Sequence, residues 1–151
     1  MNNYMDNAFS TIMPISSIEL KSVRKSDIDF LYKLLLERSH NENISHKIMP
    51  TYKKHSKFVM SKPYKKWYIL YYKNQKLGSL YLTYLNEIGI HFKKITIPDF
   101  LITKSIELLI HKNTGKRFLI NISPKNKKIL KIVKNKKSKL IQYTYELQLS
   151  D

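Results

Sequence analysis

The 151-residue chain contains no cysteine, which rules out a disulfide framework, a thiolate zinc site and a cysteine nucleophile. No run approaches the roughly 20 apolar residues that a membrane-spanning helix needs. Residues 1–17 also lack the basic start and apolar core of a secretory signal. These absences predict a cytoplasmic protein without a membrane span.

Glycine and acidic residues are also scarce. The chain has three glycines, and its 11 acidic residues face 28 lysines and arginines, which gives a net charge of +17. A field of that size attracts phosphates, nucleic acid or anionic lipid whatever the fold. The alternative is a compositional habit, because Lys, Asn and Ile are abundant throughout, as an AT-rich genome would give. The charge thus raises nucleic acid as a partner without selecting it.

The length suits one domain with one core. Residues 1–17 are polar and show no period, which predicts a flexible N-terminal arm. The remainder, 18–151, is expected to form a single domain. Within it, 18–23 alternates apolar and polar residues as a half-buried strand does.

Two helical patterns follow this strand. Ser26 with Asp29 resembles a capping box, and the helix after it repeats apolar residues at Ile28, Leu31, Leu34 and Leu35. A polar stretch, 37–46, predicts a loop. A second, short helix starts at Pro50–Thr51, with Phe58 and Val59 expected to face inward.

The second half begins with three aromatic and β-branched runs over 67–72, 77–85 and 87–92. Their short polar links predict an antiparallel meander. Pro98 suits the first turn of a helix, and Gly115 lies beyond its end, where a left-handed cap is expected.

Three further elements complete the chain. Residues 117–122 form a short apolar run typical of a buried strand, Pro124 opens a last helix, and 140–149 predicts a final aromatic-rich strand. The predicted order is β-α-α-β-β-β-α-β-α-β. The fold class is therefore α/β, in its α+β form.

Several segments resemble the GNAT superfamily of acyl-CoA-dependent N-acyltransferases, in particular bacterial members associated with amino-sugar and cell-surface polysaccharide acetylation. The resemblance covers roughly 18–149, and its segments are 50–52 with His55, 65–69, 77–82, 86–90, 121–128 and 139–147. It implies a mixed central sheet with helices on both faces. It also implies transfer of an acyl group to a primary amine on a small molecule, conceivably an amino sugar.

The resemblance implies acetyl-CoA or another acyl-CoA as cofactor. Its pantetheine arm would enter between the strands 87–92 and 117–122, and its pyrophosphate would rest on the amino end of the next helix, where free N–H groups favour an anion. The implied cofactor contacts are Ile90, Phe92, Pro98, Phe100, Asn121 and Asn126.

The cofactor loop departs from the family pattern, which reads Gln or Arg, two residues, Gly, one residue, then Gly or Ala. Here 97–102 contains no glycine. Pro98 removes a donor, Phe100 fills space that phosphate oxygens need, and Asp99 places a negative charge at the anion-binding helix end. Together these changes argue against ordinary CoA binding. A second departure is the presence of Ile129, Ile132 and Val133 in the helix where many members carry a catalytic tyrosine.

Glu87 and His91 are the catalytic candidates. By resemblance, Glu87 is the best-placed base to remove a proton from the amine; the alternative is that it merely solvates a strand end. His91 projects from the same strand on the same face, and the alternative for it is a half-buried structural imidazole.

The acceptor contacts implied by the resemblance lie in the polar loop: Glu37, Arg38, His40, Asn43 and His46. The alternative for this loop is a solvated connection of ordinary composition. No His-x-x-x-His pair with a third acidic ligand stands out, so no metal site is expected.

Eight lysines lie between Lys125 and Lys139. They are either a phosphate-contact surface or the solvated side of an amphipathic helix. Near other lysines, Tyr64, Trp67 and the Tyr71–Tyr72 pair could stack bases, although core packing is the alternative. A second hypothesis follows: a GNAT-derived module without catalysis that binds RNA or a ribonucleoprotein assembly.

Overall fold

The computed structural model of the protein describes residues 17–38 and 48–147. The part of the predicted arm before Ser17 lies outside this range. The elements are β1 (Ile18–Ser22), the 3-10 helix η2 (Lys25–Asp27), α1 (Ile28–Glu37), α2 (Tyr52–Met60), β2 (Lys66–Tyr72), β3 (Gln75–Leu82), β4 (Glu87–Phe92), α3 (Asp99–Lys112), β5 (Leu119–Ile120) and α4 (Lys127–Lys134). None of the helices in these ranges is long and apolar enough to cross a membrane.

The five strands form one sheet in the order β1-β2-β3-β4-β5. The predicted meander is confirmed, because β2, β3 and β4 pair antiparallel with their sequence neighbours. Lys73 and Asn74 both adopt positive φ values, 47° and 63°, as the tight hairpin turn between β2 and β3 requires. Among the strands of the described residues, only β5 runs parallel to its neighbour, β4.

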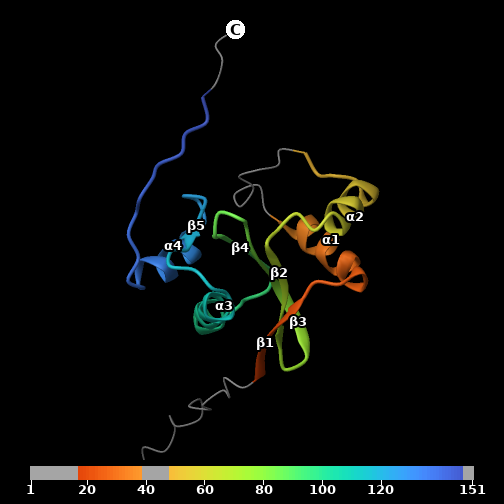
Figure 1. The fold of residues 1–151 in the computed structure, drawn as a ribbon, viewed down its shortest axis with the longest axis horizontal. Helices are drawn as coiled ribbons and strands as arrows, with labels where there is room; N and C mark the ends of the chain where they lie inside the picture. Colours follow the sequence, from red (N-terminus) through yellow and green to blue (C-terminus); the bar gives the residue numbers. More distant parts are fainter. Residues whose placement is uncertain (1–16, 39–47, 148–151) are drawn as a thin grey trace, which may run out of the picture.

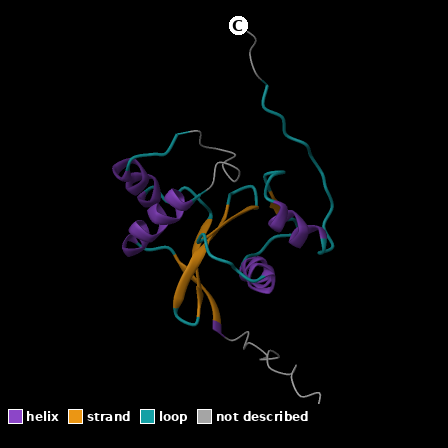
Figure 2. Cartoon of the chain, turned by 180° about the vertical axis from the view of Figure 1, so that it is seen from behind, coloured by secondary structure: helices purple, strands orange, loops and turns teal. Residues whose placement is uncertain are grey.

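Helices cover both faces of the sheet, as expected (Figure 1). On one face, α3 and α4 pack on the main core, which includes Leu70, Leu80 and Leu109. On the other, α1 and α2 pack around Leu34 and Ile69 in a smaller core. The view from behind shows the same division, with helices on either side of the strands (Figure 2). Alternation along the strands thus supplies two apolar surfaces, one for each helix pair.

The start of α1 differs from the predicted capping box. The backbone N–H of Arg24 donates to Asp27 Oδ2 at 2.8 Å, and Lys76 Nζ donates to the other oxygen at 2.7 Å. Asp29 instead accepts a hydrogen bond from the Tyr52 hydroxyl on α2. Asp27, which also bonds Lys76 of the sheet, therefore forms the capping interaction in place of Asp29.

The prediction that Phe58 and Val59 both face inward is wrong for Phe58, and the prediction that Gly115 caps a helix is wrong. Val59 is buried, but Phe58 is 42% exposed and packs edge-on against Tyr64 and Trp67. Gly115 does not adopt a positive φ, and α3 ends with Asn113, whose side-chain nitrogen donates to the carbonyl of Leu109 at 2.6 Å. A side chain therefore satisfies the helix end in place of a glycine turn.

The C-terminal prediction is also wrong. Residues 140–147 form neither helix nor strand, and 148–149 lie outside the described residues. The segment leaves the body of the domain after α4 (Figure 1). Its apolar residues are more than half exposed: Leu140, Ile141, Tyr143, Tyr145 and Leu147. Alternation gave the segment strand propensity, but a strand also needs a partner edge.

Candidate active site

The sheet opens between β4 and β5. Only two residue pairs join them, Glu87 with Leu119 and Ile88 with Ile120, supported by a 3.0 Å bond from Leu119 N–H to the carbonyl of Asn86. The expected strand 117–122 is thus reduced to two residues, while β4 continues to Phe92. In the described ranges, no strand pairs with β4 on this side after Ile88. We call residues 89–92 the open edge of β4, since their backbone can pair with an extended ligand.

Glu87 lies where the two strands separate. Its Oε1 accepts a hydrogen bond from Asn121 Nδ2 at 3.1 Å, and its Oε2 accepts one from Thr83 Oγ1 at 3.3 Å. Asn121 follows β5 directly, so the carboxylate links β4 to the chain after β5. The side chain is half-buried. A fixed, partly solvated carboxylate at this point can accept a proton from a bound amine.

His91 shares the face of Glu87 but is separated from it along β4. Gly89 lies between them, and a Cβ there would come within 1.9 Å of Tyr81 Cζ, so the Tyr81 ring covers the strand. Burial, together with the nearby positive charge of Arg38, lowers the pKa of His91 to about 4. Its Nε2 has no hydrogen-bond partner among the described residues. The imidazole is therefore neutral near pH 7 and does not touch Glu87.

An aromatic cluster borders Gly89. The rings of Tyr64 and Tyr81 stack with centroids 3.9 Å apart, and Trp67 meets Tyr64 edge-on at 4.9 Å. Trp67 Nε1 donates to Ser79 Oγ at 2.7 Å. Burial, aided by Tyr81, raises the pKa of Tyr64, which keeps its hydroxyl protonated. Sequence reasoning missed Tyr81, although a hairpin register that places a tyrosine opposite a glycine could have found it.

The acceptor contacts divide into two groups. Glu37 Oε2 accepts a hydrogen bond from the backbone N–H of Lys94 at 2.8 Å, which ties the end of α1 to the loop after β4. Arg38 lies close enough to His91 to lower its pKa. The other three candidates, His40, Asn43 and His46, lie outside the described residues.

The loop between β4 and α3 is held by the core and by α4. Ile97 is 3% exposed and packs in the main core. Lys128 Nζ donates to the Ile97 carbonyl, and it lies 3.7 Å from Asp99 Oδ1. Pro98 is exposed and Phe100 is 38% exposed. A lysine and a carboxylate therefore flank the α3 amino end, where a pyrophosphate would rest.

The remaining cofactor candidates have structural partners. Ile90 and Phe92 pack against the main core, and Asn126 Oδ1 accepts from Ile129 N–H at 3.2 Å to cap α4. The residues thus fit one half of an acyl-CoA. The open edge of β4 suits an extended arm, whereas the Asp99 carboxylate and the lack of glycine amides do not suit a diphosphate.

The described residues contain no group of three or more His, Asp or Glu side chains that could hold a metal ion.

Comparison with known proteins finds matches only among solved structures. No family model and no curated protein matches the chain. RimL, a ribosomal L7/L12 alpha-N-protein acetyltransferase in complex with coenzyme A, superposes with a TM-score of 0.66 at 17% identity, covering 82% of this chain and 81% of that chain. A domain from Methanocaldococcus jannaschii gives 0.66 at 20% identity, with 78% and 85% covered.

A third similar structure is MccE, a microcin C7 self-immunity acetyltransferase in complex with acetyl-CoA and AMP. Its TM-score is 0.60 at 18% identity, covering 78% of this chain and 76% of that chain. At such low identity the likeness concerns the fold. The chain has the GNAT fold that these acetyltransferases share.

Proposed function

We propose that the protein is an N-acyltransferase that moves an acyl group from a thioester to a primary amine. The observation that carries this proposal is the Glu87 carboxylate, held by Thr83 and Asn121 where β4 and β5 separate. The structural neighbours RimL and the spermidine N-acetyltransferase SpeG of Vibrio cholerae, both N-acetyltransferases, support it.

The reaction needs one proton acceptor and close positioning of two substrates. The amine nitrogen attacks the thioester carbonyl carbon, so that a carbon–nitrogen bond forms and the carbon–sulfur bond breaks. Glu87 takes the proton that the amine loses, directly or through a water molecule. The thiolate gains a proton from water, because Ile129, Ile132 and Val133 occupy the positions where a tyrosine acid would stand. The backbone of the open edge of β4 aligns the donor.

The acceptor is proposed to be a small molecule with a primary amine, conceivably an amino sugar. Glu37 and Arg38 place one negative and one positive side chain at the end of α1, on the sheet face that carries Glu87 and His91. Charged groups at this end suit a polar acceptor. His91 stays a proposed catalytic residue that would act as a neutral imidazole, since burial holds its pKa at about 4.

A donor–acceptor panel tests the proposal. The wild-type protein is incubated with acetyl-CoA or with the acetyl thioester of N-acetylcysteamine, and with spermidine, a short peptide or an amino sugar; mass spectrometry detects the N-acetyl product. Replacing Glu87 by Gln should lower kcat/KM by about 10²–10⁴-fold. Amide formation by none of the pairs would count against an acyltransferase.

Glu19→Gln is the matched control. Glu19 lies on β1 at the opposite edge of the sheet and pairs with Lys21 at 3.0 Å. The Glu19→Gln variant removes one carboxylate charge, as Glu87→Gln does, but at a position away from the proposed active site. Its kcat/KM should therefore stay at the wild-type value. Equal losses in both variants would assign the effect to net charge and not to a base at residue 87.

A further inference from the structure

We propose that the thioester donor is a phosphopantetheine arm carried on a small acidic protein, and that a lysine surface beside α4 binds this carrier. This inference rests on the proposed acyltransferase function. We define the α4 lysine surface as Lys125, Lys127, Lys131, Lys134, Lys137 and Lys139. All six side chains belong to exposed residues.

The first step of the argument is the mismatch between the two halves of an acyl-CoA. The open edge of β4 can pair with an extended arm, yet the loop that should receive the diphosphate has lost its glycines. Lys128 bonds the Ile97 carbonyl and neighbours Asp99 there. A donor whose arm enters the sheet but whose far end is not a free nucleotide removes this conflict.

The second step is where the far end of such an arm would emerge. β4 and β5 are parallel, so the helices that follow them, α3 and α4, both begin at the same edge of the sheet. The contact between Lys128 of α4 and Ile97 beside α3 shows that the two amino ends are neighbours. An arm that leaves the open edge of β4 therefore emerges next to α4.

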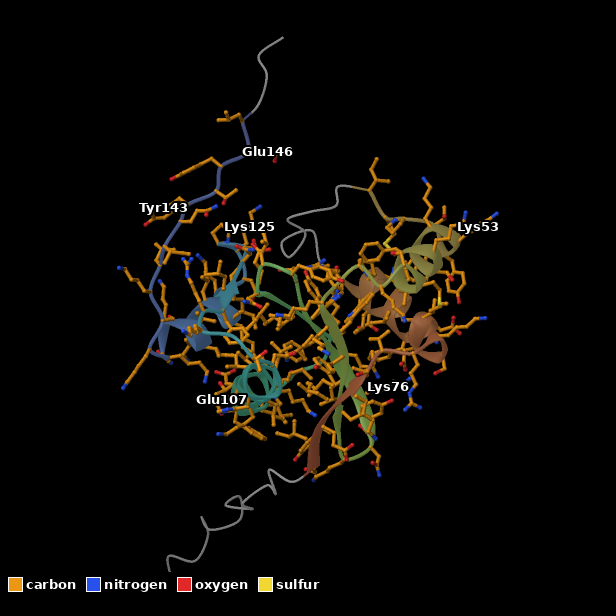
Figure 3. The ribbon with its side chains drawn as sticks, in the orientation of Figure 1. Lys53, Lys76, Glu107, Lys125, Tyr143 and Glu146 are labelled. Atoms are coloured by element: carbon orange, nitrogen blue, oxygen red, sulfur yellow. The ribbon has the colours of Figure 1, made fainter. Side chains whose placement is uncertain are left out.

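The third step is the charge at that exit. Of the eight lysines between Lys125 and Lys139, two form ion pairs: Lys128 with Asp99, and Lys136 with Glu107 at 2.7 Å. The six that make up the α4 lysine surface have no ion-pair partner among the described residues. Lys125 is labelled on the β5 side of the molecule, far across from Lys53 of α2 (Figure 3). This unpaired positive charge starts at the amino end of α4, next to the exit, and continues along the helix and past its carboxyl end. Such a surface steers and orients an acidic protein.

An RNA partner would use the same charge differently. Sequence-tolerant binding of single strands needs exposed aromatic faces on which bases stack. Tyr64, Tyr81 and Trp67 pack against one another instead, and they lie on the sheet face that α1 and α2 cover. This cluster therefore offers no stacking platform beside α4, although Tyr143 and Tyr145 of the C-terminal segment are exposed. The mismatch with a free diphosphate at the α3 amino end, and not the charge, favours an acidic carrier protein over RNA.

The experiment compares transfer from three donors that present the same acetyl thioester on different carriers. They are acetyl-CoA, the acetyl thioester of N-acetylcysteamine, and a bacterial acyl carrier protein with an acetylated phosphopantetheine arm. We expect kcat/KM for the carrier-bound donor to exceed that for acetyl-CoA by about tenfold or more. The advantage should shrink between about 50 and 300 mM salt, because exposed charges are screened.

Charge reversal on α4 tests the binding surface. Lys131→Glu with Lys134→Glu should lower kcat/KM for the carrier-bound donor by about tenfold and leave transfer from the short thioester unchanged. Lys53→Glu with Lys57→Glu on α2 is the matched control, because it changes the net charge equally at exposed sites on the opposite face. Binding of carriers with and without the arm, measured by calorimetry, should show tighter binding when the arm is present.

The outcomes separate the two proposals. Transfer from none of the donors overturns the acyltransferase function and this inference with it. Transfer from acetyl-CoA as efficient as from the carrier overturns only the inference, as do equal losses in the α4 and α2 variants. Salt-sensitive binding of a short RNA that Lys131→Glu with Lys134→Glu abolishes, without carrier binding, would assign the surface to RNA.

Discussion

The junction of β2 with β3 and the junction of β4 with β5 belong to the same sheet but differ in kind. Seven residue pairs join β2 to β3, and Leu70, Leu80 and Leu82 are fully buried along them. Two pairs join β4 to β5, and Leu119 and Ile120 are only half-buried. The first junction holds the domain together, whereas the second leaves a strand edge open beside Glu87.

The largest expected effect is at the closed junction. Leu80→Ala should lower the free energy of unfolding by about 2–5 kcal/mol, because it leaves a cavity in the main core. Ile120→Ala at the open junction should cost clearly less. Urea denaturation of both variants measures the difference. Equal losses would show that the two junctions contribute alike, which breaks the comparison.

A substitution at Gly89 tests whether packing of the Tyr81 ring of β3 over Gly89 stabilises the open edge of β4. Gly89→Ala puts a Cβ into the Tyr81 ring, so Tyr81 must leave its stack on Tyr64. We expect a loss of about 1–3 kcal/mol in the free energy of unfolding. The Tyr81→Ala, Gly89→Ala double variant should lose no more than Tyr81→Ala alone. An additive loss in the double variant would show that Gly89→Ala destabilises the fold through contacts other than the Tyr81 ring.

His91 makes stability depend on pH near the open edge. Burial keeps its pKa at about 4 in the folded state, while an imidazole in the unfolded chain has its ordinary pKa of 6.5. Below the unfolded value the unfolded chain binds the extra proton, so stability is present above that pKa and falls as pH drops. Between about pH 7.5 and about pH 5 the loss should reach about 2 kcal/mol.

Urea denaturation at both pH values checks this prediction. His91→Gln should remove most of the pH dependence. The pH dependence that remains in this variant is expected from His55, because burial lowers the pKa of His55 in the same direction. A wild-type protein equally stable at both pH values would show that His91 is solvated.

The smallest effect should come from the C-terminal segment. Removing 140–151 should change the free energy of unfolding by less than about 0.5 kcal/mol, since the apolar residues of 140–147 are exposed. Thermal or urea unfolding of the truncated chain measures it. A loss near that of Leu80→Ala would mean that the segment completes the sheet beyond β5, and the junction of β4 with β5 would no longer be the weaker one.

Local patterns predicted the meander and the helices because each depends on a short period. Alternation in 67–72 and 77–85, together with a turn as short as Lys73–Asn74, leaves one economical pairing. The same alternation in 140–149 failed, because pairing also requires an edge that lies within reach. The predicted capping box of Ser26 with Asp29 is wrong for a similar reason: the box forms between Arg24 and Asp27, and Lys76 on a distant strand also bonds Asp27.

For the candidate site, the sequence supplied the residue types but not their grouping. Glu87 stays a predicted base, yet its partner Asn121 was assigned to the cofactor. Tyr81 was not singled out at all. Glu37 stays a predicted acceptor contact, and the structure adds that its carboxylate accepts a hydrogen bond from the loop after β4. These relations join residues that are far apart in sequence, and periodicity carries no information about them.

The positive charge, the order of elements from β1 to α4 and the lack of glycine in the loop before α3 can all be read from the chain. These features are local, because composition and short-range alternation fix them. Three other features depend on the folded arrangement: β4 and β5 separate after Ile88, Asn121 holds Glu87, and Lys128 reaches Ile97. Those features arise when distant side chains pack together, and packing is set by the whole fold.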